Sequence, residues 1–396
     1  MKFEELKPSN PEVIAEIACG HEGSVAKFIE LIDLVSSTNV KIIKSQIFLP
    51  EERASLNHPE REIFTKLAFS KRQWKEISDY IKQQGLIFFV DIFGLKGLEI
   101  AKGLEVGGYK IHSEDLLNSY FILEVARINK PLLIGVGGAH RKEIFQLLSF
   151  LKSKNSCNKI ILMPGIQTFP TPLKLHSIGE IQDLYNNYSQ EFNVKIGCAD
   201  HLKGNSEDSL IFPLACLTAG ASVIEKHFTK NRSLKWEDYE SAMDVKRFKK
   251  FLKKLDQYST LLKKPSNLNS AEKKYRKQFK KVPAAQKTIR SGQKILDKDI
   301  YYSKEEKLKT PLSALNIVGK SSSKLIKKAD FIDLSQLNEN VGCVLVVRNG
   351  SQRLPYKAME KIQGKETIRL LIERLKRLKN TNKLILATTN DKKDDS

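Results

Sequence analysis

Residues 194–228 read VKIGCADHLKGNSEDSLIFPLACLTAGASVIEKHF, and this stretch contains the pattern that decides the fold. A short apolar segment rich in β-branched residues (194–200) precedes a segment with helical periodicity (206–219) and a second apolar segment (221–228). Similar apolar segments lie at 13–18, 40–46, 86–92, 108–113, 131–137 and 159–165, with helical stretches between them. Alternating β and α units predict a parallel sheet, and eight units in about 250 residues predict a closed (β/α)8 barrel of the α/β class. The alternative, a doubly wound open sheet, usually has a glycine-rich turn after its first strand, and residues 17–24 (IACGHEGS) lack that spacing.

Two smaller parts follow the predicted barrel domain at 1–255. Residues 256–281 are basic and punctuated by Pro, Asn and Ser, which is typical of a linker with some helix. Residues 282–337 predict a small domain with a turn at Ser291–Gly292. Residues 341–396 predict a strand, a loop, a helix (366–379) and a second strand (383–389). Such a unit cannot bury both faces of its sheet alone, so we expect it to be the N-terminal fragment of a larger α/β domain.

The net charge of +21 is concentrated in the C-terminal third of the chain: residues 1–255 hold 35 basic and 31 acidic side chains, whereas residues 256–396 hold 32 and 15. The basic runs contain only two aromatic residues, Tyr275 and Phe279, which is fewer than a nucleic-acid stacking platform requires. No apolar run approaches the roughly 18 residues of a membrane span, and the first residues do not resemble a secretory signal. The five cysteines are scattered and odd in number, which argues against a disulfide framework or a structural zinc site. We expect a cytoplasmic protein without nucleic-acid or membrane partners.

Polar side chains stand at the C-terminal ends of most predicted strands, where a barrel keeps its chemistry. They are Glu16, Lys44, Gln46, Asp91, Lys110, Ser113, Asp200, His201, Glu225 and His227. Two imidazoles, His201 and His227, suit a divalent ion with open positions for water and a carbonyl oxygen; the alternative is a pair of core or surface histidines. Lys44 and Lys110 predict an anionic substrate, unless Glu16 and Asp115 neutralise them.

Several short motifs, in order and in register, resemble the sialic acid synthase family of phosphoenolpyruvate-condensing barrels. They are AEIACGHEGS (15–24), KIIKSQ (41–46), YKIHSED (109–115), FPTP (169–172), GCADH (197–201) and VIEKHFT (223–229). Residues 282–337, with TIRSGQKILDKDI at 288–300, are similar to the small antifreeze-like domain that follows the barrel in that family. Residues 346–357 (VVRNGSQRLPYK) are similar to the start of the cytidylyltransferases that activate such acid sugars.

The resemblance implies condensation of phosphoenolpyruvate with an N-acetylhexosamine aldehyde such as N-acetylmannosamine, with C–O cleavage and release of phosphate. It also implies a domain-swapped homodimer. His201 and His227 match the ligands of a divalent metal, Mn2+ or Mg2+, with Co2+ as a further option. Lys44, Lys110 and Ser113 match the phosphoenolpyruvate contacts, with Gln46 and Asp91 beside them.

The remaining positions of that site concern the acceptor sugar and the catalytic water. Glu16, Glu225 and Asp238 match the acidic positions there, and Glu225, then Asp115, is the expected acceptor of the water's proton. Gln167 and Phe169 stand where asparagine and tyrosine usually line the sugar site. In the C-terminal fragment, the residues expected to bind the phosphates of cytidine triphosphate are Arg348, Ser351, Arg353 and Lys357.

The chain departs from the family at Gly135 and Ala199, where phosphate-binding serines are usual. Two lost hydroxyl groups would weaken phosphate binding by about 1 kcal/mol each. Two alternatives therefore stay open: a non-catalytic sugar-phosphate-binding scaffold, or a synthase for a different aldehyde. The sequence does not choose among the precursors of sialic, legionaminic and pseudaminic acid.

Overall fold

The computed structural model describes residues 1–263, 267–304, 311–338, 342–348, 356–377 and 383–388. The chain forms two compact units, Met1–Lys264 and Pro265–Ser396. Within the described ranges, no helix has both the length and the apolar character needed to cross a membrane.

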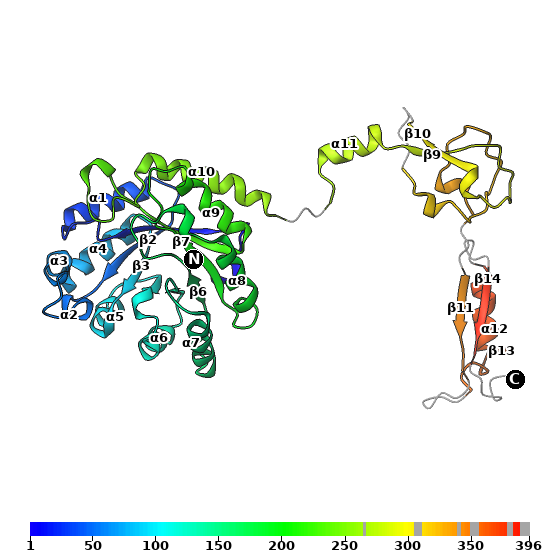
Figure 1. Ribbon diagram of the computed structural model, residues 1–396. Helices are drawn as coiled ribbons and strands as arrows, with labels where there is room; N and C mark the ends of the chain where they lie inside the picture. Colours follow the sequence, from blue (N-terminus) through cyan, green and yellow to red (C-terminus); the bar gives the residue numbers. More distant parts are fainter. Residues whose placement is uncertain (264–266, 305–310, 339–341, 349–355, 378–382, 389–396) are drawn as a thin grey trace. The chain divides into compact units, whose positions relative to one another are not determined.

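The first unit is a closed barrel of eight parallel strands, which confirms the predicted fold (Figure 1). The strands are β1 (Glu12–Ala18), β2 (Ile42–Ile47), β3 (Ile87–Ile92), β4 (Gly108–Ile111), β5 (Leu132–Gly135), β6 (Ile160–Met163), β7 (Lys195–Ala199) and β8 (Ala221–His227). Each strand pairs with its neighbours in sequence, and β8 closes the barrel against β1. The helices of this unit are α1 (Val25–Ser36), α2 (Pro50–Arg53), α3 (Arg61–Leu67), α4 (Lys71–Gln83), α5 (Gly94–Lys102), α6 (Ser119–Ala126), α7 (Arg141–Ser153), α8 (Ile178–Tyr188), α9 (Asp208–Thr218) and α10 (Val245–Leu261).

Helix α4 shows how local sequence sets these elements. Ser70 caps its N-terminus, accepting a hydrogen bond from the Gln73 backbone while the Gln73 side chain bonds back to Ser70. Trp74, Ile77 and Ile81 then recur at helical spacing and are buried. The cap satisfies otherwise unpaired backbone groups, and the apolar stripe attaches the helix to the barrel.

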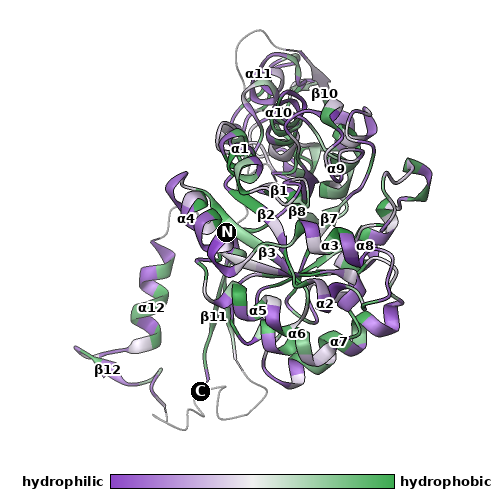
Figure 2. Ribbon diagram, turned by 90° about the vertical axis from the view of Figure 1, so that its left-hand side faces the viewer, coloured by the Kyte–Doolittle hydropathy of each residue, from purple (hydrophilic) through white to green (hydrophobic). Residues whose placement is uncertain are grey.

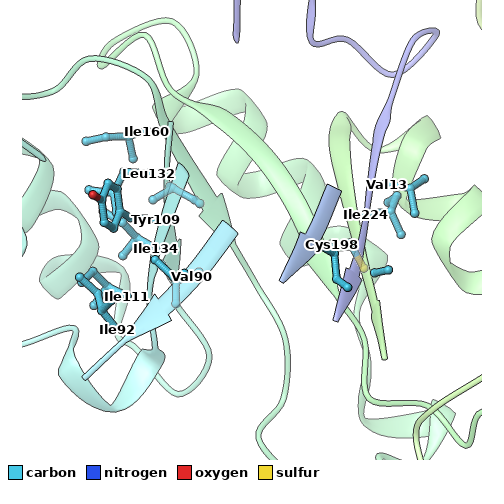
Figure 3. Close-up of a cluster of buried hydrophobic side chains, with 14 of the residues drawn as sticks. Val13, Val90, Ile92, Tyr109, Ile111, Leu132, Ile134, Ile160, Cys198 and Ile224 are labelled. Atoms are coloured by element: carbon cyan, nitrogen blue, oxygen red, sulfur yellow. The ribbon is translucent and has the colours of Figure 1, made fainter. Parts of the chain in front are cut away.

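Two layers of apolar side chains hold the barrel together. Successive residues of a strand point to opposite faces, so each strand contributes to both layers. The inner layer includes Ile14, Ile42, Phe89 and Val223. Phe3, which precedes the first strand, belongs to the same buried cluster. The outer layer lies between the strands and helices, and Figure 3 shows part of it. Figure 2 shows hydrophobic and hydrophilic residues mixed along the helices that surround the barrel.

Helix α10 extends past the predicted barrel boundary at 255. Its buried residues, Phe248, Phe251, Leu255 and Ser259, continue one face of the helix to its last turn, which ends at Leu261. The predicted linker at 256–281 therefore contains the end of α10 and all of a further helix, α11 (Ser270–Phe279).

Within the described residues, the second unit contains three two-stranded sheets. Strands β9 (Val282–Ala285) and β10 (Ile300–Ser303) pair antiparallel beside a small core of buried residues that are mostly isoleucines. Gly292, in the predicted turn, has a φ of +77°, which favours glycine. Strands β11 (Gly342–Val346) and β14 (Lys383–Ala387) pair in parallel. The third sheet pairs β12 (Lys361–Ile362) with β13 (Lys365–Glu366), and the unit also contains α12 (Thr367–Lys376). The predicted strand, helix and strand are thus present at the C-terminal end.

Candidate active site

A pocket lies where the C-terminal ends of the barrel strands converge. The side chains that line it are Glu16, Gln46, Asp91, Lys110, His112, Gln167, Phe169, His201, Glu225, His227 and Asp238. All but His112 are site residues predicted from the sequence. Closure of the sheet brings them together because parallel strands of one barrel end at the same rim.

A network of buried charges forms one wall of this pocket. Lys44 pairs with Glu16 and lies 3.6 Å from Oδ2 of Asp91 and 3.6 Å from Oε2 of Glu225. Nζ of Lys110 donates to Oε1 of Glu225 at 2.7 Å and lies 3.6 Å from Oδ2 of Asp91. Glu16 thus neutralises Lys44, as in the alternative considered from the sequence. Within the described residues, however, the charge of Lys110 is neutralised by Glu225 and Asp91, and not by Asp115 as that alternative expected.

The charges in this network alter one another's pKa values. Burial lowers the pKa of Lys44 to about 8, against the opposite effect of Glu225. Burial also disfavours the charged form of Lys110, but Glu225 and Asp91 outweigh it and raise the pKa of that lysine. Burial alone would raise the pKa of Glu225, yet Lys110 and Lys44 hold it well below its usual range. The Lys110–Glu225 pair is therefore fully ionised near neutral pH.

Some hydrogen-bonding capacity in the network is unused. Both carboxylate oxygens of Asp91 and Oε2 of Glu225 are buried and lack a hydrogen-bond partner among the described residues. Buried polar atoms are normally paired, so such a cluster beside a pocket is typical of a site that receives a polar ligand.

His201 and His227 line the same pocket, with ring centroids 5.4 Å apart, and His227 lies on β8 two residues after Glu225. Nδ1 of His201 lies 2.6 Å from the carbonyl oxygen of Ile166, so this nitrogen carries the proton and Nε2 is free to bind a ligand. Burial lowers the pKa of His201 to about 4. Burial, with a smaller contribution from His201, also lowers the pKa of His227 well below its usual value. Both rings are therefore neutral at neutral pH, the form that binds metals.

The histidine pair fits a divalent cation with open coordination positions. Nδ1 of His227 is buried and has no hydrogen-bond partner in the described part of the chain. No group of three or more His, Cys, Asp or Glu side chains is arranged to hold a metal ion within the described ranges. A cation bound here would depend on the two imidazoles and on water or substrate oxygens for its other ligands.

Phe169, Gln167 and Asp238 complete the mouth of the pocket. The ring of Phe169 lies 4.3 Å from that of His201, centroid to centroid, and 48% of the residue is exposed. The side-chain amide of Gln167 donates to the carbonyl oxygen of Gly165 at 3.3 Å. Burial raises the pKa of Asp238. Asp238 is thus a stronger base than Glu225 and faces the same space.

Ser113 and Asp115 do not line the pocket, contrary to the prediction from the sequence. They form a short 3-10 turn that follows β4. Burial, Glu114 and Asp91 raise the pKa of Asp115, so this carboxyl group lies near the charge network although it does not line the pocket. His112 lines the pocket instead. It lies two residues after Lys110, on the same face of an extended chain, and this spacing could have identified it.

The departure at Gly135 has a steric basis, whereas nothing in the structure explains the alanine at position 199. A Cβ atom on Gly135 would lie 2.7 Å from the backbone nitrogen of Ser113. Backbone therefore occupies the space that a serine at position 135 would need.

In the C-terminal fragment, Arg348 and Lys357 are exposed. Ser351 and Arg353 lie outside the described residues.

Comparison with known proteins agrees with this geometry. The sequence profile of the NeuB family matches residues 31–267, and that of a cytidylyltransferase matches residues 343–396. The pseudaminic acid synthase of Campylobacter jejuni is 24% identical over 333 residues, covering 80% of this chain and 94% of that protein. The N,N'-diacetyllegionaminic acid synthase of the same organism is 23% identical and covers 71% and 86%. The crystal structure of the N-acetylneuraminic acid synthetase from Leptospira borgpetersenii superposes with a TM-score of 0.61 at 25% identity, covering 67% of this chain and 90% of that chain.

Proposed function

Because the chain belongs to the NeuB family, we propose that it condenses phosphoenolpyruvate with the open-chain aldehyde of an N-acetylated hexosamine. The product is a nine-carbon acid sugar, and inorganic phosphate is released. One observation carries the proposal: a lysine network and two neutral imidazoles lie together at a single pocket.

The lysine wall suits the anionic substrate. Lys110 lines the pocket and Lys44 lies buried beside it, so that both can attract the phosphate and carboxylate of phosphoenolpyruvate. The network nevertheless has one more negative charge than positive charge, because three carboxylates face two ammonium groups. The carboxylates are those of Glu16, Asp91 and Glu225. A further cation in the pocket would offset both this excess and the charge of the substrate.

The histidines would hold that cation. When bound there, Mn2+ or Mg2+ supplies Lewis acidity toward the aldehyde oxygen and positive charge near the enol phosphate. The Nδ1 atom of His201 is held by the carbonyl oxygen of Ile166, so Nε2 would bind the cation. In His227, Nδ1 has no hydrogen-bond partner among the described residues. Phe169 covers the His201 ring and limits access of water.

The bonds change in two steps. The enol carbon attacks the aldehyde carbon, the new C–C bond forms, and the aldehyde oxygen takes up a proton from solvent. Water then adds to the oxocarbenium-like carbon, and the C–O bond to phosphate breaks. In this proposal Asp238 takes the water's proton, because its raised pKa makes it a stronger base than Glu225. Glu225, the first choice from the sequence, instead balances the charge of Lys110.

The test measures released phosphate and product mass with phosphoenolpyruvate, Mn2+ and a series of acceptors. The series includes N-acetylmannosamine and diacetamido-trideoxyhexoses, which distinguish the precursors of sialic, legionaminic and pseudaminic acid. Phosphate release should require both metal and acceptor. His201→Ala and His227→Ala should abolish bound Mn2+, whereas His58→Ala, at a half-exposed histidine, should not. A wild-type protein that binds no metal and releases no phosphate with any acceptor would instead support the scaffold alternative.

A further inference from the structure

Asp200 and Lys226 form a completely buried ion pair outside the pocket. Nζ of Lys226 donates to Oδ1 of Asp200 at 2.7 Å, and both side chains are 0% exposed. The backbone nitrogen of Leu202 donates to the same oxygen at 3.3 Å. These are the only hydrogen bonds of the two side chains within the described ranges.

Strand alternation places this pair directly behind the two histidines. In β8, Val223 belongs to the inner layer and Glu225 and His227 line the pocket, so Lys226 points outward with Ile224. Beyond the end of β7, Asp200 likewise points outward, although the sequence grouped it with the site residues. Each partner of the ion pair is therefore covalently next to one histidine, on the reverse side of the barrel wall.

The pair also continues the connection between the two strands. The β7–β8 ladder ends at Ala199 opposite Glu225, so Asp200 and Lys226 meet one residue further on. Different loop residues hydrogen-bond to the backbone of each histidine. The His201 carbonyl oxygen accepts from the Thr171 backbone nitrogen and the Ser241 hydroxyl group. The His227 carbonyl oxygen accepts from the Met243 backbone nitrogen. The ion pair is thus a direct side-chain link between the two strands, one residue beyond the last ladder pair.

Stability alone does not explain a buried ion pair. Removing two charges from water is costly, and well-packed apolar side chains of similar volume often stabilise a protein as well or better. Ion pairing adds instead a defined distance and direction between two atoms. Side chains behind metal-binding histidines commonly influence affinity in this way.

We propose that the Asp200–Lys226 ion pair is a positioning device that holds the ends of β7 and β8 so that His201 and His227 can bind one cation. The inference rests on the proposed function, because it assumes that these histidines bind a divalent metal. It adds two residues that touch neither the pocket nor the cation.

The test compares Mn2+ affinity with stability in the full-length protein. Asp200→Leu combined with Lys226→Met replaces the pair by apolar side chains of similar length. Free Mn2+ is titrated by electron paramagnetic resonance, and unfolding is followed in urea. We expect the double variant to bind Mn2+ about 10- to 100-fold more weakly while remaining as stable as the wild type. Arg141→Gln with Asp183→Asn removes a 2.8 Å ion pair between α7 and α8, far from the histidines in the chain, and should leave affinity unchanged.

Each outcome decides the proposal. Equal Mn2+ affinity of the wild type and the double variant overturns the positioning role but leaves the proposed function intact. A wild-type protein without Mn2+ affinity overturns both. If the double variant does not fold, Asp200→Asn carries the test, because it keeps the side-chain shape and removes the charge. We expect it to bind Mn2+ about 10-fold more weakly, and wild-type affinity in a folded Asp200→Asn protein also overturns the proposal.

Discussion

Replacing Lys110 by methionine should destabilise the barrel strongly at neutral pH and much less in mild acid. Lys110 is 7% exposed and its partner Glu225 is 2% exposed, so the variant leaves a carboxylate buried without its closest cation. Breaking a buried ion pair from one side costs about 3–5 kcal/mol. Removing an exposed pair by Lys75→Met, next to Asp79, should cost less than about 1 kcal/mol and is the matched control.

The pH dependence follows from the pKa of Glu225. In the wild type this pKa is lowered, so the ion pair's contribution to stability is present above the ordinary value of 4.5 and is lost as the pH falls toward the folded-state value. Without Lys110, burial is opposed mainly by Lys44, so the pKa of Glu225 rises from its lowered wild-type value. The carboxyl group can then take up a proton in mild acid, and the loss of stability should shrink between about pH 7 and about pH 5.

Urea unfolding followed by tryptophan fluorescence measures this effect. The chain contains two tryptophans, Trp74 and Trp236, and both lie in the barrel unit, so the signal reports on that unit. Lys110→Arg, which keeps the charge, should recover part of the loss. A deficit below about 1 kcal/mol at neutral pH, or one that does not change with pH, would refute the reasoning.

Three further changes test other parts of the structure. Gly135→Ser should lower the free energy of unfolding by about 1–3 kcal/mol, because its Cβ would lie 2.7 Å from the backbone nitrogen of Ser113; an unchanged melting temperature contradicts this. Phe169→Ala should raise KM for the acceptor more than KM for phosphoenolpyruvate, because the ring covers His201; steady-state kinetics with each substrate varied would show equal effects if this is wrong. A chain ending at residue 338 should keep phosphate release, because every described pocket residue lies in the barrel; loss of turnover in a folded truncated protein would contradict the assignment.

The predicted site was incomplete where side-chain direction departs from strand regularity. The sequence places Lys110, Ser113 and Asp115 together after one strand, but β4 ends at Ile111 and the chain then turns. The turn removes Ser113 and Asp115 from the pocket and leaves His112 in it. Short turns of this kind depend on contacts with the next strand, such as the close approach of Gly135 at the end of β5, which local periodicity does not encode.

The amino-acid sequence alone determined the barrel and the rim that carries the chemistry. Apolar segments of strand period alternate with segments of helical period, and both periods are local properties that neighbouring residues specify. The tertiary structure alone decided which charges meet. Lys110 pairs with Glu225, 115 positions away, and Lys226 turns from the pocket to pair with Asp200. Such partners depend on closure of the sheet and on which face each last strand residue occupies, because the energy of a buried charge is set by its neighbours in space.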